Sequence, residues 1–114
     1  MNSTKTGQKA EEAAKVYLEM RGYKIVEQNY KRSRCEIDIV AQRNNTMYFV
    51  EVKYRRNDSQ GSGLEYVTQT KLRQMQFAAE TWVEEYKWHG DYQLSAIEIA
   101  GNDFVILSFI ENVL

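Results

Sequence analysis

The sequence has few of the residues that build disulfide frameworks or zinc clusters. It contains one cysteine, Cys35, and one histidine, His89, among 114 residues. A disulfide framework or a cysteine/histidine zinc cluster needs several such residues, so a single chain can assemble neither. This cysteine usage fits a reducing compartment.

Long hydrophobic runs are also missing. The longest, FVILSFI at 104–110, is far shorter than the about 20 residues that span a membrane. The first twelve residues, MNSTKTGQKAEE, lack the apolar segment of a secretory signal. We therefore expect a soluble, cytoplasmic protein with no membrane partner. With 43% apolar residues, the chain can bury one core, which predicts a single domain over 1–114.

A strong net charge is missing too, but the charges are unevenly distributed along the chain. The net charge is −1, yet residues 21–56 hold nine Lys/Arg against four Asp/Glu, and residues 57–114 hold three against nine. This asymmetry favours one basic face on an otherwise neutral protein, although two ordinary mixed surfaces would give the same totals.

Hydrophobic periodicity predicts two helices and five strands. The predicted helices cover 8–21, ending at Gly22, and 65–87; the predicted strands cover 23–30, 35–43, 47–55, 91–100 and 103–110. This order predicts an α/β sandwich with a central mixed sheet flanked by helices. The polar segment NDSQGSG at 57–63 is predicted to be a loop, either a plain solvent loop or one that closes on substrate.

The second and third strands carry charged residues at facing positions. If the chain turns at Asn44-Asn45, Asp38 lies opposite Glu51, and Glu36 lies opposite Lys53. A three-residue loop or a bulge would shift this register by one and separate the pairs. The apolar residues of the two strands would share the other face: Ile37, Ile39, Ala41, Tyr48, Val50 and Val52.

Facing carboxylates in an apolar hairpin favour a cation site. Directly opposed side chains have β-carbons about 4.5–5.5 Å apart, where like charges repel unless a cation compensates them. Two carboxylates without a soft ligand nearby favour Mg²⁺ or Mn²⁺. Lys53 shares the face of Glu51 and would orient a water and offset charge on a phosphate, which suits phosphodiester hydrolysis.

An ordinary structural explanation covers part of this pattern. Glu36 opposite Lys53 is also a common cross-strand ion pair. Asp38 opposite Glu51 is harder to explain in that way, because a sequence selected only for stability avoids facing carboxylates.

Two residues of the predicted helices bear on the same site. Lys71 interrupts an apolar stripe between Val67 and Met75, so it either reaches the site or extends past the core to solvent. Glu11 lies in line with Ala14 on the first helix, and it is either a third carboxylate for the site or a solvated helix charge.

The segments EIDIV at 36–40 and FVEVKYR at 49–55 resemble the signature of the PD-(D/E)XK nuclease superfamily. The wider layout resembles the YraN-like bacterial proteins of that superfamily, which are related to archaeal Holliday-junction resolvases. The resemblance covers nearly the whole chain. Its further matching elements are Gly7, Glu11, Ala14, Tyr17, Leu18, GY at 22–23, QNY at 28–30, Val67, Lys71 and FIENVL at 109–114.

The resemblance implies a restriction-endonuclease-like αβββαββ fold and a role for each matching residue. It implies a catalytic set of Asp38, Glu51, Lys53 and Glu11, with Mg²⁺ or Mn²⁺ bound by Asp38, Glu51 and the carbonyl of Val52. It also implies phosphate contacts from Arg55, Lys71 and Gln69. The basic segments KRSR and YRR flank this site along the chain and add Lys31, Arg32, Arg34 and Arg56 as nucleic-acid contacts.

Two departures from the family pattern leave the predicted metal residues intact. The family has glycine where this chain has Ala10 and Cys35, and an RFD-like motif where this chain has QLS at 93–95. The second change bears on substrate handling rather than on the metal site.

Three functional hypotheses follow. The leading one is a Mg²⁺- or Mn²⁺-dependent endonuclease-like protein acting on DNA, branched DNA included; a two-fold homodimer would suit the symmetric nicking of a junction. The first alternative is a nucleic-acid-binding module of the same fold that does not cleave. The second is a protein-interaction domain whose face is built on exposed Tyr86, Trp88 and Tyr92 and the acidic C-terminal half, and it requires Trp88 to be accessible.

Overall fold

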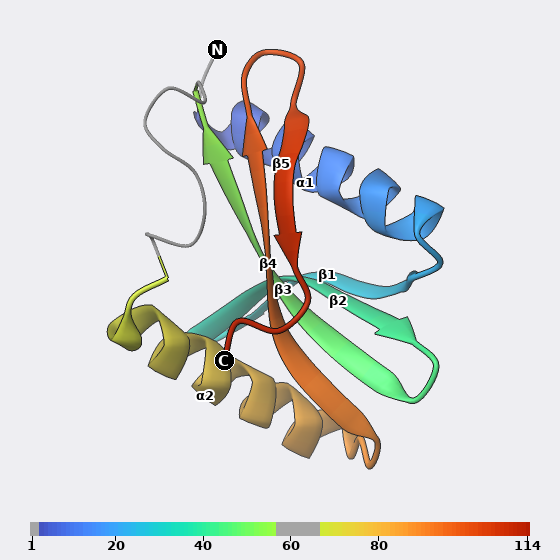
Figure 1. The fold of residues 1–114 in the computed structure, drawn as a ribbon. Helices are drawn as coiled ribbons and strands as arrows, with labels where there is room; N and C mark the ends of the chain where they lie inside the picture. Colours follow the sequence, from blue (N-terminus) through green and yellow to red (C-terminus); the bar gives the residue numbers. More distant parts are fainter. Residues whose placement is uncertain (1–2, 57–66) are drawn as a thin grey trace.

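The computed structural model describes residues 3–56 and 67–114, which form two helices and five strands (Figure 1). In chain order these elements are α1 (Ser3–Met20), β1 (Lys24–Arg32), β2 (Cys35–Arg43), β3 (Thr46–Arg55), α2 (Gln69–Tyr86), β4 (Asp91–Ala100) and β5 (Val105–Ile110). The predicted αβββαββ order is confirmed.

The strands form one mixed sheet in the order β1-β2-β3-β4-β5. Strands β1, β2 and β3 are antiparallel neighbours, β3 and β4 are parallel, and β4 and β5 are antiparallel. A parallel pair needs a crossover connection, and α2 lies in the segment that joins β3 to β4. Strand β3 therefore lies at the centre of the sheet, with β2 on one side and β4 on the other.

The two helices cover opposite faces of this sheet (Figure 1). The core under α1 includes Ala10, Ala14, Leu18, Tyr23, Ile39, Ala41, Tyr48, Val50, Ile97 and Ile99. The core under α2 includes Tyr30, Ile37, Val40, Met47, Phe49, Met75, Ala78, Ala79, Trp82 and Leu94. Neither helix of the described ranges is long and apolar enough to cross a membrane. With these two cores, apolar side chains cover both faces of the central strands.

Local backbone features fix the ends of the elements. Gly22 has φ +89° after α1, and Asn44 has φ 56° in the β2–β3 turn, both in the left-handed region that glycine and asparagine tolerate. Thr68 caps the N-terminus of α2, where its Oγ1 accepts a hydrogen bond from the backbone N–H of Lys71 at 3.1 Å. The cap fixes where the first turn of α2 begins, and with it the place of Lys71.

The element bounds differ from the predicted ranges at several ends. Helix α1 begins at Ser3, and β1 continues to Arg32, so the predicted basic turn is shortened to Ser33 and Arg34. In the described residues α2 begins at Gln69, directly after its Thr68 cap. The predicted loop at 57–63 and the predicted helix start at 65 and 66 lie outside the described residues.

The prediction that Ile37 shares a face with Ile39 is wrong. Ile39 lies in the core under α1, whereas Ile37 lies in the core under α2. The neighbouring strand is irregular at this point, because Asn29 of β1, between the pairs Gln28↔Ile39 and Tyr30↔Ile37, has φ 54°. Asp38 lies opposite this irregularity in β1.

Candidate metal and nucleic-acid site

The β2–β3 ladder has the predicted register and ends next to Asp38. Residues pair from Arg43↔Thr46 to Ile39↔Val50, as a two-residue turn at Asn44-Asn45 requires. Beyond the last ladder pair, a side chain of β2 contacts the backbone of β3. The Oδ2 of Asp38 accepts a hydrogen bond from the N–H of Val52 at 2.7 Å. This hydrogen bond holds the carboxylate of Asp38 against β3 beside Glu51, just past the pair Ile39↔Val50.

Glu51 points toward α2 and contacts a lysine there. Its Oε2 lies 2.9 Å from Nζ of Lys71, and the two side chains keep 21% and 33% of their exposure. Of the two alternatives for Lys71, the structure has the one in which this side chain reaches the site. Glu51 therefore has an ammonium group on one side and the carboxylate of Asp38 near the other.

Asp38 has an electrostatic environment that disfavours its charged form. Burial, followed by the negative charge of Glu51, raises the pKa of Asp38 to about 7 against a hydrogen bond from Val52 that lowers it. The charges of Glu11 and Glu36 add smaller contributions in the same direction. A bound cation would reverse this balance, because it would favour the charged carboxylate.

Glu11 of α1 faces the same group of carboxylates. Burial raises its pKa, a side-chain hydrogen bond with Asn29 lowers it, and the charges of Glu36 and Glu51 raise it further. The structure thus brings Glu11 into the electrostatic neighbourhood of the site. Within the described ranges, however, no three His, Cys, Asp or Glu side chains lie close enough together to hold one metal ion between them.

Glu36 pairs with β1 rather than forming the predicted ladder pair with Lys53. Lys31 is its ladder neighbour, and Nζ of Lys31 lies 4.0 Å from its Oε2. The predicted cross-strand position was extrapolated from a register that stops at Ile39↔Val50. Lys53 itself is exposed and lies beside Glu98 in the parallel β3–β4 ladder.

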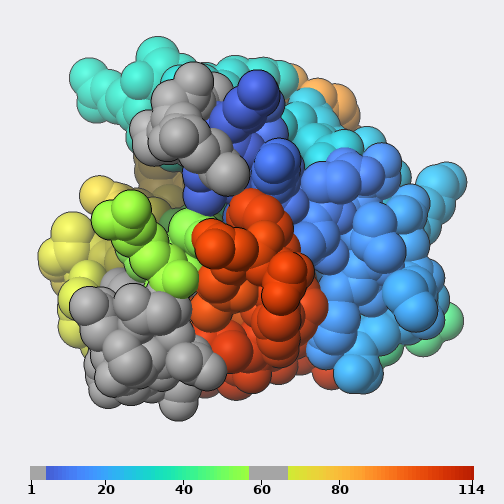
Figure 2. Space-filling view, turned by 90° about the horizontal axis from the view of Figure 1, so that it is seen from above, coloured from blue at the N-terminus to red at the C-terminus, as the bar shows by residue number. Residues whose placement is uncertain are grey.

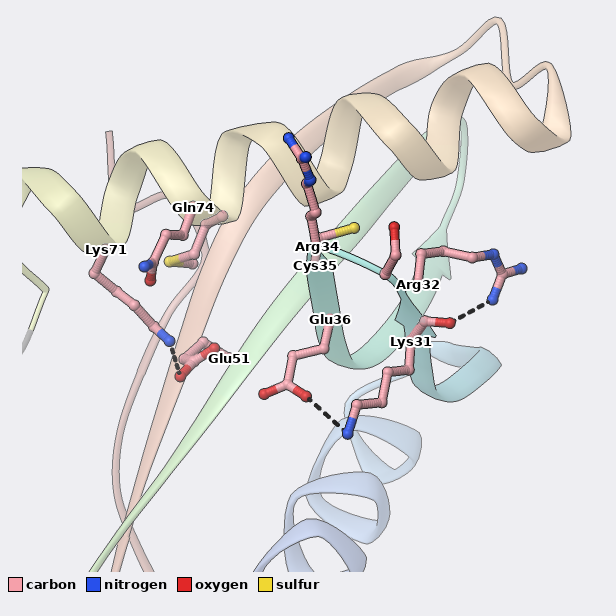
Figure 3. A pocket seen from close by; sticks show the side chains of 10 residues that line it. Lys31, Arg32, Arg34, Cys35, Glu36, Glu51, Lys71 and Gln74 are labelled. Carbon is pink, nitrogen blue, oxygen red and sulfur yellow. Dashed lines mark hydrogen bonds and ion pairs between the residues drawn. The ribbon is translucent and has the colours of Figure 1, made fainter.

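A pocket of about 310 Å³ opens beside Glu51 (Figure 3). Its lining residues come from the adjoining ends of β1 and β2 with the turn between them, from Glu51 of β3, and from the first turns of α2. Four predicted nucleic-acid residues are among its lining residues: Lys31, Arg32, Arg34 and Lys71. A smaller hollow, which Glu36 also lines, includes Lys31, Asn29 and Asp38. Glu51 therefore borders the larger pocket and Asp38 the smaller hollow, and Lys31 and Glu36 line both.

Arg32 is held in place by residues outside the pocket. Its Nε donates to Oε1 of Glu85 at 2.9 Å, its Nη2 contacts Oε2 of the same carboxylate, and its guanidinium lies over the ring of Tyr30. Tyr30 also donates a hydrogen bond to Glu85, at 2.8 Å. These contacts fix the basic turn against the C-terminal half of α2.

The other predicted nucleic-acid residues lie away from this pocket. Arg55 forms an ion pair with Glu98, and their side chains keep 14% and 0% of their exposure. Arg56 is exposed and borders a separate hollow with Gly101 and Asp103. Figure 2 shows the end of β3 (green) beside the β4–β5 turn (orange-red) at that face. Gln69 is exposed on the first turn of α2 and is not a lining residue of the pocket.

Two residues of α2, Gln74 and Met75, line the pocket, and this role was not predicted for them from the sequence. Gln74 follows Lys71 by three residues and Met75 follows it by four, the spacings that place helical side chains on one face. The spacing from Lys71 therefore indicates in the sequence that these two residues lie on the same side of the helix as Lys71. The apolar stripe that includes Met75 predicts only a core position for this residue.

The aromatic surface required by the interaction-domain alternative is largely used by the core. Trp88 is half-buried and donates from Nε1 to the carbonyl of Asp91 at 2.9 Å. Tyr92 is half-buried against Phe49. Tyr86 keeps 48% exposure and packs against Trp82. Trp88, on which that alternative depends, is therefore not an open surface residue.

Comparison with known proteins shows the family of this chain. A family model described as "Uncharacterised protein family UPF0102" matches residues 10–105. A UPF0102 protein of Cytophaga hutchinsonii is 37% identical over 106 residues, which is 93% of this chain and 94% of that protein. UPF0102 proteins of Vibrio campbellii and Caldicellulosiruptor saccharolyticus are 37% and 34% identical, over 93% and 98% of this chain and 88% and 98% of their own lengths. The chain belongs to the uncharacterised protein family UPF0102, the YraN-like group that its sequence resembles.

Proposed function

We propose that this protein is a metal-dependent endonuclease-like enzyme that hydrolyses DNA phosphodiester bonds. The observation that carries the proposal is the placement of Asp38 beside Glu51, next to a basic pocket. A fold under selection for stability alone would avoid a carboxylate whose pKa is raised to about 7 by burial and a like charge.

The residues present fit a hard divalent cation. Mg²⁺ usually keeps several waters and is bound by one or two carboxylates together with substrate phosphate, so a cluster of three acidic side chains is not required. Asp38, Glu51 and the carbonyl of Val52 would hold Mg²⁺ or Mn²⁺ here. When bound, the cation would stabilise the negative charge that develops on the phosphate during cleavage.

Each charged residue around the site has a task in this proposal. Lys53 would orient the attacking water and offset charge on the phosphate. Lys71 keeps Glu51 in place through its 2.9 Å contact and would turn to the phosphate when a cation takes over that carboxylate. Glu11 would orient groups in the outer coordination shell, given its electrostatic coupling to Glu36 and Glu51.

The basic residues of the pocket would position the DNA backbone without reading its sequence. Lys31 and Arg32 at the end of β1 and Arg34 in the β1–β2 turn line the pocket that Glu51 borders. Contacts of this kind supply affinity that falls steeply with salt. Branched DNA is the proposed substrate, in which case two copies related by a two-fold axis would cut two strands. The proposed compartment is the cytoplasm, in keeping with the single cysteine.

The test incubates the protein with Mg²⁺ or Mn²⁺ and a panel of single-stranded, duplex, flap and four-way-junction DNA. We expect metal-dependent cleavage that falls by about a thousandfold or more in Asp38→Asn and Lys53→Ala. Glu12→Gln, which removes an exposed α1 carboxylate, serves as the matched control and should cleave normally. Cleavage that is absent throughout, or unchanged in the variants, would sink the catalytic assignment.

The Glu51–Lys71 ion pair favours a second candidate, a nucleic-acid-binding module of the same fold. The ammonium of Lys71 already neutralises Glu51 at 2.9 Å, as a cation would. In that case the wild-type protein and Asp38→Asn would bind the same DNA equally well, and neither would cut it.

A further inference from the structure

The pocket beside Glu51 has room for one nucleotide. Its volume of about 310 Å³ lies at the lower end of the range of about 300–1,000 Å³ typical of small-ligand sites. A paired base lies inside its duplex and cannot enter such a pocket unless it is extruded from the stack. The size therefore suits a single unpaired base with its sugar and phosphate.

The chemistry of the pocket wall also suits a base. Met75 supplies an apolar sulfur-containing surface, and Arg34 supplies a planar guanidinium on which a base can stack. Gln74 carries a carboxamide, which both donates and accepts hydrogen bonds and can pair with a base edge. Figure 3 shows Gln74 and Lys71 on α2 across the pocket from Lys31 and Glu36 of the strands.

The two residues that would contact the base are the ones with unused polar groups. Lys31, Arg32, Glu36, Glu51 and Lys71 each have an ion-pair partner. Among the residues that the structure describes, Arg34 and Gln74 are the long polar side chains of this pocket for which no partner side chain or backbone group is found. They can therefore bind a ligand without first giving up an interaction.

We propose that this pocket receives one unpaired DNA nucleotide, with Arg34 stacking on its base and Gln74 contacting the base edge. The inference rests on the proposed function and deepens it: the preferred substrate is DNA with an unpaired nucleotide next to the phosphodiester held near Asp38 and Glu51. Lys31 and Lys71 flank the pocket and contact the phosphates on either side. Fully paired DNA binds more weakly, because a base must first be unstacked.

The test measures the affinity ratio between two DNA duplexes of the same sequence, one fully paired and one with a single extra unpaired nucleotide. Fluorescence anisotropy in EDTA reports binding without cleavage. The wild-type protein should bind the bulged duplex about tenfold more tightly, the size expected for one base contact. Gln74→Ala and Arg34→Lys, which keeps the charge but loses the planar group, should each bring this ratio near one.

Arg73→Ala is the matched control on α2, because Arg73 is exposed, contacts Thr70 and does not line the pocket. It should weaken binding of both duplexes together and preserve their ratio. A wild-type ratio of one, or a ratio unchanged in Gln74→Ala, would overturn the nucleotide pocket even if the protein cleaves DNA. A tenfold ratio without any cleavage would support the pocket while the proposed enzyme activity fails.

Discussion

Strand β3 carries two ion pairs that differ in their access to solvent. Glu51 pairs with Lys71 of α2 and borders the pocket, whereas Arg55 pairs with Glu98 of β4 and is enclosed in the sheet. The side chain of Glu98 has no exposure, while Glu51 and Lys71 keep 21% and 33%. In the proposed function, the accessible pair exchanges one partner for a ligand. The buried pair supports the fold.

Breaking the buried pair should have the largest effect on stability. Glu98→Gln leaves the Arg55 guanidinium inside the sheet without its carboxylate, which costs about 3–5 kcal/mol in the free energy of unfolding. Urea unfolding followed by circular dichroism measures this loss. Glu51→Gln should cost less than about 1 kcal/mol, because that pair is partly solvated.

A double variant controls for this first prediction. Arg55→Met with Glu98→Leu removes both buried charges at once and should restore most of the lost stability. If Glu98→Gln proved less destabilising than Glu51→Gln, the division of β3 into a structural pair and a site pair would be wrong.

The second prediction concerns the pH dependence of stability at the site end of β3. The folded-state pKa of Asp38 is raised to about 7, above the value of about 4 in an unfolded chain, so the folded state holds this proton more tightly. Asp38 therefore weakens folding as the pH rises from about 4 to about 7. Asp38→Asn removes this effect, and its side-chain oxygen still accepts from the Val52 N–H.

We expect Asp38→Asn to be about 1–3 kcal/mol more stable than the wild-type protein at pH 8, with no gain at pH 4. Thermal unfolding at the two pH values measures the difference. Asp103→Asn, an exposed residue in the β4–β5 turn, is the control and should give the same small change at both. A gain for Asp38→Asn of equal size at pH 4 and pH 8 would contradict the assigned cause.

The smallest expected effect is the coupling of Glu51 with Lys71. A double-mutant cycle of Glu51→Gln and Lys71→Met should give about 0.2–1 kcal/mol at low ionic strength, and less in 1 M salt. The corresponding cycle for Arg55 and Glu98 should show larger coupling with little salt dependence. Coupling energies of the same size and salt dependence in both cycles would contradict the claim that one pair is solvated and the other buried.

The elements and the central register could be predicted because local rules decide them. Alternating apolar residues gave the strands, and Asn44-Asn45 gave a two-residue turn, which fixed the pairs from Arg43↔Thr46 to Ile39↔Val50. The family resemblance and the charge pattern together predicted nucleic-acid contacts from Lys31, Arg34 and Lys71. In the structure these three residues line one pocket.

The failures lie where tertiary contacts override the local pattern. Strict alternation placed Ile37 with Ile39, but the two side chains lie in different cores, at a point where the neighbouring β1 has the left-handed Asn29. A different limit concerns Arg55, for which the family resemblance implied a phosphate contact and which the structure places in an ion pair within the sheet. Its partner Glu98 comes from β4, and no local pattern in the sequence identifies that pairing.

The central claim is that Asp38 and Glu51 together bind a hard divalent cation, and a Mn²⁺ titration at pH 8 tests it most directly. Isothermal calorimetry would be run on the wild-type protein, Asp38→Asn, Glu51→Gln and the control Glu12→Gln. We predict saturable binding of one Mn²⁺ per chain by the wild-type protein and the control, with affinity at least about tenfold lower in both site variants. No saturable binding by the wild-type protein, or undiminished binding by Asp38→Asn, would contradict the account.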